Sequence, residues 1–149
     1  MLGLMQAFLR HLTLLYGALF TCYASAVSAN ALEERWIATS TAAFSITGDI
    51  LLSPTRLRTE RADFPLKAVA DVAHFRGEFG PVSARVLAVT KPKNPTLLNG
   101  NTLCRRPVRW FVVSHTKGGE LELDIFEGKQ MPTSVRSDGA CGVFFYSRP

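Results

Sequence analysis

Residues 108–126 read VRWFVVSHTKGGELELDIF and carry the clearest strand signal in the chain. Apolar and polar residues alternate with a period of two on both sides of a glycine-containing loop, which is typical of a β-hairpin. Pairing the strands so that Trp110 faces Leu123 creates an apolar face of three cross-strand pairs: Val108 with Ile125, Trp110 with Leu123, and Val112 with Leu121. The same register places Arg109 opposite Asp124, an ion pair that favours it. We therefore predict a hairpin in this register, with its loop at residues 115–118.

The remainder of the chain from Trp36 onward also alternates with a period of two, and it lacks apolar residues at helical spacing. Extended segments are expected at residues 36–39, 43–46, 49–52, 55–60, 66–72, 82–89 and 142–146. Glycine, proline and Asn-Gly sequences separate these segments and predict turns between them. We predict an all-β fold, a small antiparallel barrel or sandwich of about seven or eight strands, in a single domain over residues 30–149.

Residues 1–29 have the organisation of a removable signal peptide. Arg10 precedes an uncharged apolar centre, and two sequences of the A-x-A type follow it, ending at Ala26 and Ala29. We predict a helical signal peptide with cleavage after Ala29, Ala26 being the alternative, and hence a periplasmic or secreted protein without a membrane span after processing. A retained membrane anchor and a lipid-modified Cys22 are the other interpretations, which polar residues in the segment and the bulky Phe20 disfavour.

Cleavage after Ala29 leaves two cysteines, Cys104 and Cys141, in an oxidising compartment. We predict that they form a disulfide, which closes a loop of about 38 residues and stabilises the fold by about 4 kcal/mol. Only His74 and His115 could join the cysteines as metal ligands, and no Cys-x-x-Cys sequence is present. We therefore expect no metal site and no cofactor.

The candidate ligand-binding residues are four arginines, in two groups: Arg56 and Arg58, and Arg105 and Arg106. The chain has a net charge of +5, and removal of the signal peptide leaves +4. A mildly basic surface with arginines on one strand face is suited to a phosphate or carboxylate, so an anionic envelope ligand or a protein partner is expected. The alternative is an edge strand that charge protects from pairing with another chain. Binding of nucleic acid is not expected, because no aromatic ladder accompanies the arginines.

The residues that could support catalysis are few and poorly arranged. Ser114 and His115 are adjacent, and neighbours in a strand point to opposite faces. Asp71 and His74 could meet only in a helical turn, and two ligands do not make a metal site. Glu120, Glu122 and Asp124 lie on one strand face, which we interpret as the solvated side of a half-buried sheet. We therefore predict that the protein is not an enzyme.

Three segments resemble small, uncharacterised proteobacterial proteins that carry signal peptides: Ile46–Ile50, Leu98–Cys104 and Cys141–Tyr146. The resemblance implies a periplasmic location and no particular activity. In size and disulfide content the chain is also similar to exported inhibitors of c-type lysozyme, although those inhibitors bind a basic enzyme and this chain is itself basic. We therefore predict a non-catalytic binding or envelope-associated module. The alternative is an inhibitor of an envelope hydrolase that inserts a protruding loop, Lys91 to Asn101, into an enzyme.

Overall fold

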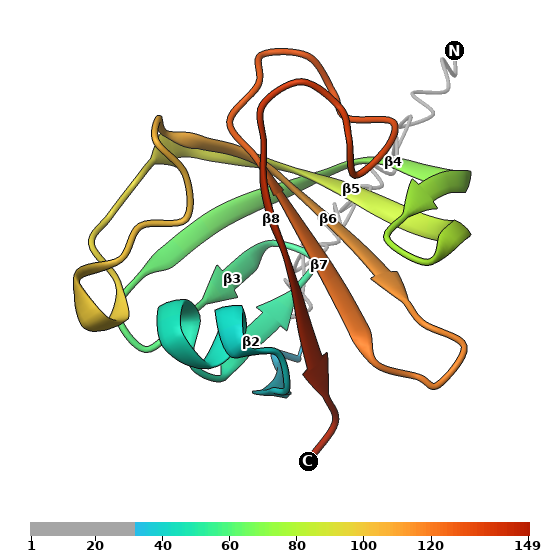
Figure 1. Cartoon of the computed structure of the whole chain (residues 1–149). Coiled ribbons are helices and arrows are strands. Elements are labelled where there is room, and N and C mark those ends of the chain that lie inside the picture. The colour runs from blue at the N-terminus through green and yellow to red at the C-terminus, as the bar shows by residue number, and fades with distance from the viewer. Residues whose placement is uncertain (1–31) are drawn as a thin grey trace, which may run out of the picture.

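The computed structural model describes residues 32–149, which form a closed barrel of eight antiparallel strands (Figure 1). Each strand pairs with the next along the chain, and the last strand pairs with the first. The strands are β1 (Glu34–Ala38), β2 (Ile50–Ser53), β3 (Arg56–Arg58), β4 (Asp63–Gly77), β5 (Gly80–Lys93), β6 (Val108–His115), β7 (Leu121–Phe126) and β8 (Ala140–Ser147). The predicted all-β fold is confirmed, and of the two expected architectures, barrel and sandwich, it is the barrel, whereas the predicted signal peptide lies outside the described residues.

The simple up-and-down order of the strands gives the barrel two different ends. One end, here called the open end, holds the start of β1, the end of β8 and the three connections β2–β3, β4–β5 and β6–β7. The opposite end, the closed end, holds the longer connections, including two helical turns, η1 (Ala43–Thr47) and η2 (Leu98–Gly100). The two turns contact each other, because Asn99 and Asn101 both donate hydrogen bonds of 3.0 Å to the Ser45 carbonyl.

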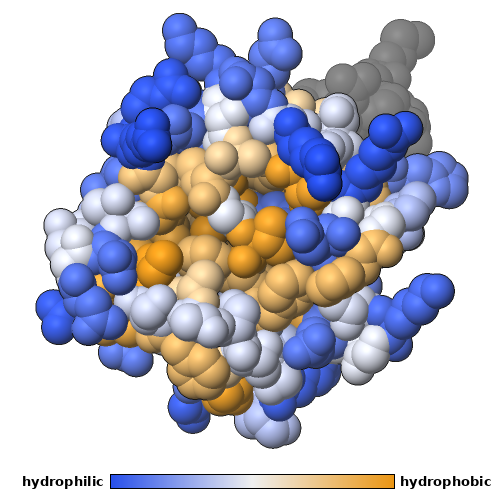
Figure 2. Space-filling view, in the orientation of Figure 1, coloured by the Kyte–Doolittle hydropathy of each residue, from blue (hydrophilic) through white to orange (hydrophobic). Residues whose placement is uncertain are grey.

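Alternate side chains of the strands point into the barrel and make its core. Large apolar residues from all eight strands contribute to one buried cluster, among them Trp36, Ile50, Leu57, Phe64, Leu87, Phe111, Leu123 and Phe144. In the space-filling view, apolar side chains gather at the hollowed centre of the face shown in Figure 1, and hydrophilic side chains surround them (Figure 2). On this face, apolar surface is therefore open to solvent inside a polar rim.

The β4–β5 hairpin is the longest in the barrel, and its end covers the outer faces of β7 and β8. Irregularities in the β4–β5 pairing, between Ala68 and Ala70 and between Val72 and Phe75, allow the hairpin to bend. At its tip the Glu78 N–H donates to Glu122 Oε1 at 2.8 Å, and the Phe79 ring lies 5.6 Å from the Phe145 ring. A second buried cluster forms beneath the hairpin, outside the barrel: Phe75, Ala84, Val86, Val112 and Phe126.

The predicted register of the β6–β7 hairpin is wrong by three residues, because Trp110 pairs with Phe126 rather than with Leu123. The turn lies further along the chain than predicted: Gly119, with φ of 85°, donates to the Thr116 carbonyl, and Thr116 pairs with Glu120. Odd-numbered residues of both strands therefore face the barrel interior. The prediction assumed one solvent-exposed face, but every residue of β7 is buried, so the apolar pattern alone did not determine the register.

The segment 43–46 was also expected to be a strand, and it forms the helical turn η1 instead. Ser40 starts this turn: its carbonyl accepts from the Phe44 N–H at 3.0 Å, and its Oγ accepts from the Ala43 N–H at 3.2 Å. Serine is a favoured residue at the N-terminus of a helix for this reason. The turn is anchored to the barrel by Thr47 Oγ1, which is 2.7 Å from the Tyr146 hydroxyl.

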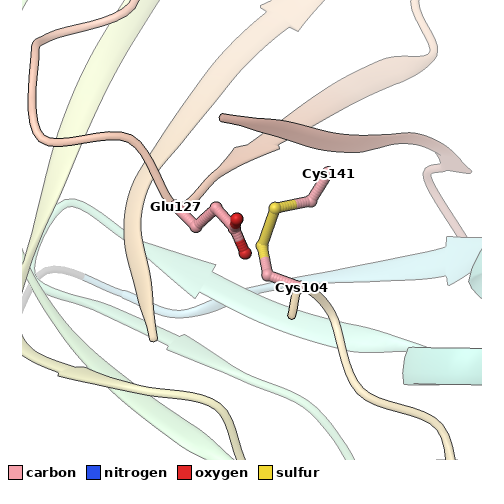
Figure 3. Close-up of side chains that lie close together, drawn as sticks. All are labelled: Cys104, Glu127 and Cys141. Atoms are coloured by element: carbon pink, nitrogen blue, oxygen red, sulfur yellow. A yellow bond between two sulfur atoms is a disulfide. The ribbon is translucent and has the colours of Figure 1, made fainter. Parts of the chain in front are cut away.

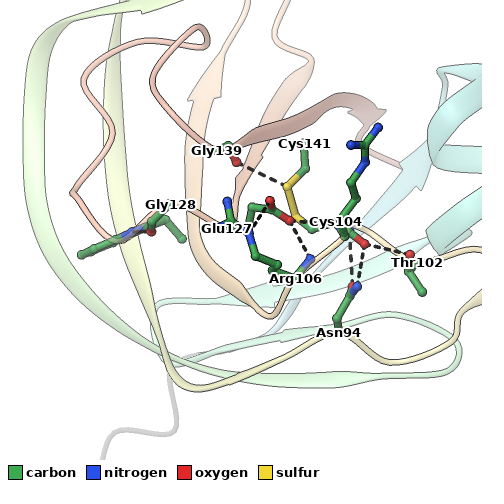
Figure 4. Close-up of a disulfide and its surroundings, with 10 residues drawn as sticks. Asn94, Thr102, Cys104, Arg106, Glu127, Gly128, Gly139 and Cys141 are labelled. Atoms are coloured by element: carbon green, nitrogen blue, oxygen red, sulfur yellow. Dashed lines mark hydrogen bonds and ion pairs between the residues drawn. A yellow bond between two sulfur atoms is a disulfide. The ribbon is translucent and has the colours of Figure 1, made fainter.

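The predicted disulfide between Cys104 and Cys141 is confirmed, with the two Cα atoms 5.2 Å apart. It joins the β5–β6 connection to the beginning of β8 at the closed end. Asn94 accepts from the Cys104 N–H and donates to the Cys104 carbonyl, so the segment around the first cysteine is fixed on both sides (Figure 4). The disulfide therefore fastens the strand that closes the barrel to the loops that cover its end.

No helix among residues 32–149 is long and apolar enough to cross a bilayer.

Removal of the disulfide in the Cys104→Ala/Cys141→Ala variant is expected to lower the free energy of unfolding by about 4 kcal/mol, because the unfolded chain regains the entropy of a loop of about 38 residues. Urea denaturation followed by circular dichroism measures the loss. A reductant should lower the stability of the wild-type protein to that of the variant and leave the variant unchanged. Equal stability of the wild-type protein and the variant in the absence of a reductant would contradict the prediction.

Candidate functional site

A cavity of about 690 Å³ opens at the open end of the barrel, and its walls come from six strands. The start of β1, the β2–β3 turn, the middle of the β4–β5 hairpin and the tip of β6–β7 all contribute. The volume lies in the range of pockets that hold small organic molecules. An eight-stranded barrel has an interior just wide enough for side chains or for one small ligand, so a cavity at its mouth is the natural place for a ligand.

The floor of this open-end cavity is apolar because the strand residues that point inward reach it. Trp36 of β1, Leu87 of β5 and Leu121 of β7 are buried, while Leu52 of β2 and Val113 of β6 are partly buried. These five side chains surround the cavity from different strands. A ligand that covers them would remove apolar surface from water, at about 25 cal/mol for each Å² buried.

The rim of the cavity carries charged groups that are already paired. Arg85 Nε lies 2.8 Å from Asp71 Oδ1, and these two residues are also cross-strand neighbours. Arg148 Nη2 lies 3.6 Å from Glu34 Oε2, and its guanidinium carbon is 5.2 Å from the centre of the Trp36 ring. Each ion pair joins one positive and one negative side chain, so the rim has no net charge from these groups and by itself attracts neither cations nor anions strongly.

Trp36 is the central residue of the cavity. Its side chain is 2% exposed and its ring is flanked by Arg148 and by His115, whose ring centre is 5.6 Å away. The indole Nε1–H has no hydrogen-bond partner among the described residues. A buried donor without a partner is costly to a folded protein, and indole is a donor only. The Nε1 atom is itself buried, so a ligand acceptor would reach it only if neighbouring side chains moved.

The four predicted arginines lie in separate places and are largely engaged. Arg56 pairs with Asp63 at 3.4 Å and Arg58 with Glu33 at 3.2 Å, both on the surface beside β3. Arg105 and Arg106 lie in the β5–β6 connection at the closed end, where Glu127 accepts hydrogen bonds from both backbone N–H groups and pairs with the side chain of Arg106 alone. No described contact joins the two groups, and none of the four lines the open-end cavity. An anionic ligand for them stays a prediction, and the arginines of the cavity are Arg85 and Arg148 instead.

Glu127 organises the segment next to the disulfide (Figure 4). Its carboxylate accepts from the backbone N–H groups of Arg105 and Arg106 and from Arg106 Nε, at 2.7 to 2.9 Å. These donors, chiefly the backbone N–H and side chain of Arg106, lower the pKa of Glu127. Figure 3 shows the carboxylate close to the two sulfur atoms, all within 4.8 Å. Because the sulfur atoms are bonded to each other, neither is a free thiolate ligand, and the arrangement serves the fold.

The loop expected to protrude, Lys91 to Asn101, is packed against the closed end. Its first part belongs to β5, and the Leu97 side chain is 2% exposed in the main core. Hydrogen bonds from its asparagines to Ser45 and Cys104 hold the remainder. The described residues therefore offer no free loop here for insertion into an enzyme.

The prediction that Glu122 and Asp124 are solvated is wrong: each is 1% exposed, beneath the end of the β4–β5 hairpin. Glu122 accepts a hydrogen bond from Glu78, but neither oxygen of Asp124 has a partner among the described residues. Burial, followed by the nearby charges of Glu122 and Glu78, raises the pKa of Asp124 to about 8. At neutral pH this side chain is therefore mainly a neutral carboxylic acid.

The other candidate pairs do not form catalytic arrangements. Ser114 is buried on the outer face of β6 with no partner for its hydroxyl, whereas His115 lines the cavity, as expected for neighbours on a strand. Asp71 and His74 lie on β4, which is a strand and not a helical turn, and Asp71 binds Arg85. Among the described residues no nucleophile is hydrogen-bonded to a histidine.

Comparison of the chain with protein-family models, with curated proteins and with solved structures found no match.

We predict that stability falls as pH rises from 5 to 8, because Asp124 keeps its proton in the folded state and has lost it in the unfolded chain. The single-group effect approaches about 1.4 kcal/mol per pH unit in this range. Urea denaturation at several pH values measures the slope. Asp124→Asn should flatten it, whereas Asp138→Asn, which changes an exposed carboxylate, should not. Identical slopes in the wild-type and Asp124→Asn proteins would show that Asp124 is ionised when folded.

Proposed function

We propose that this protein is a non-catalytic binding module that holds a small, largely apolar molecule in the open-end cavity. The observation that carries the proposal is the cavity itself, about 690 Å³ in volume, with an apolar floor from five strands and a buried indole N–H without a partner. Binding pockets typically combine an apolar lining with a few polar groups that orient the ligand. The location that we propose, periplasmic or secreted, is drawn from residues 1–29 and fits a module stabilised by a disulfide.

Binding is favoured over catalysis by the state of the polar groups. The two arginines and two carboxylates of the cavity are engaged in ion pairs, and within the described part of the chain His115 is not hydrogen-bonded to a nucleophile. General acid–base or nucleophilic catalysis needs such groups within hydrogen-bond distance of each other and of the substrate. The apolar walls, in contrast, need no further partner to bind an apolar molecule.

The neutral probe N-phenyl-1-naphthylamine tests the proposal, because its fluorescence rises when it enters an apolar site. The chain has two tryptophans, so the Trp110→Phe variant leaves Trp36 as the only one. We expect saturable binding of the probe, accompanied by quenching of Trp36 emission through energy transfer to the bound probe. Purification from cells that express the full chain supplies the protein.

A larger side chain in the wall should reduce this binding. In Val113→Phe the ring would occupy part of the cavity, and we expect the affinity for the probe to fall about tenfold, the effect of about 1.4 kcal/mol. Val69→Phe makes the same change at a position of β4 that is 48% exposed and does not line the cavity, and should have no effect. Thermal denaturation of both variants checks their folding. Equal affinity of all three proteins, or no binding by the wild-type protein, would contradict the proposed function.

A further inference from the structure

The polar groups around Trp36 indicate what kind of head group the ligand carries. Three groups that can donate hydrogen bonds meet there: the indole N–H, the Arg148 guanidinium and the His115 ring. The acceptors of the rim, the carboxylates of Glu34 and Asp71, are both bound to arginines. Of the donors, the indole N–H has no partner among residues 32–149. Beside its apolar floor, the cavity therefore has more hydrogen-bond donors than acceptors that are free for a ligand.

Arg148 is the charged donor that a ligand can recruit at low cost. Its contact with Glu34 is 3.6 Å long, and the two side chains are 69% and 57% exposed. An exposed ion pair of this kind contributes little, so redirecting the guanidinium toward a ligand loses little. Arg85 differs, because its 2.8 Å contact with Asp71 is short. Arg148 also lies over the face of the Trp36 ring, with its guanidinium carbon 5.2 Å from the ring centre, so the guanidinium and the indole are neighbours at the rim.

We propose that the ligand is an aliphatic monocarboxylic acid, whose carboxylate binds Arg148 and Trp36 Nε1 while its chain covers Leu52, Leu87 and Leu121. The inference rests on the proposed function and adds the chemical class of the ligand. A carboxylate has two acceptor oxygens, and hydrogen bonds between charged partners are about twice as strong as neutral ones. An alcohol of the same length offers a single weak acceptor, and an ammonium group offers no acceptor to either donor.

The test compares three compounds with the same ten-carbon chain: decanoate, decan-1-ol and decylamine. Each displaces bound N-phenyl-1-naphthylamine from the protein at pH 7.5, below the critical micelle concentration. We expect decanoate to bind about tenfold more tightly than decan-1-ol, and decylamine to bind most weakly. Equal affinities of decanoate and decan-1-ol would overturn the inference and leave the proposed function intact. If the probe itself does not bind, the proposed function fails as well.

Two substitutions assign the preference to the named donors. Arg148→Gln changes an exposed residue beyond the end of β8 and is not expected to affect folding. It should weaken decanoate binding about tenfold and change decan-1-ol binding less than twofold. Trp36→Phe should weaken decanoate binding severalfold, with thermal denaturation as a check because Trp36 belongs to the core. Arg61→Gln, an exposed arginine between β3 and β4, is the matched control. An unchanged preference for decanoate in Arg148→Gln would overturn the inference.

Discussion

The pairing of β1 with β8 is the constraint on which the barrel depends, because it removes the two free edges that the sheet would otherwise have. The pairing itself is short, with Ile37 opposite Ser147 and Ala38 opposite Tyr146. It is reinforced outside the ladder by the Thr39 N–H, which donates to the Phe145 carbonyl, and by the contact between Thr47 and the Tyr146 hydroxyl. The disulfide fixes the other end of β8. A small domain thus secures its last strand at both ends.

The sequence was sufficient to predict most of the strands, the all-β class and the disulfide, because local periodicity marks the strands and two cysteines remain to pair. It was insufficient for the β6–β7 register. Counting apolar residues assumes that polar residues face water, but the outer face of β7 is covered by a hairpin that begins more than forty residues earlier, at Asp63. The alternating Glu122 and Asp124 therefore indicated a solvent-exposed strand face, whereas in the fold a second buried layer covers this face. Similarly, the alternating pattern of residues 43–46 predicted a strand, but the hydrogen bond from the Ala43 N–H to Ser40 Oγ starts a helical turn there.

The candidate site was missed for a related reason. Each wall residue of the open-end cavity is an ordinary member of an alternating strand, and only closure of the sheet brings Trp36, Leu87 and Leu121 together. The members of each arginine group are close together in the chain, yet their carboxylate partners lie 7 to 25 positions away. Local clusters of charge are visible in a sequence, whereas a cavity in a barrel is a property of the whole topology. Trp36, a large residue with one polar atom, lies in the middle of the first strand and gives no separate signal in the sequence.

The β4–β5 hairpin connects the cavity with the buried acid pair. Its middle, Asp71 to Ala73 and Ser83 to Arg85, forms one wall of the cavity, while its tip covers Glu122 and Asp124 on the outside of the barrel. The hydrogen bond from Glu78 to Glu122 lies within this cover, close to the neutral Asp124. Because one bent hairpin makes both contacts, the position of the cavity wall depends on how the tip packs. The uncharged carboxylic acid of Asp124 therefore lies beneath the tip of the same hairpin whose middle forms one wall of the cavity.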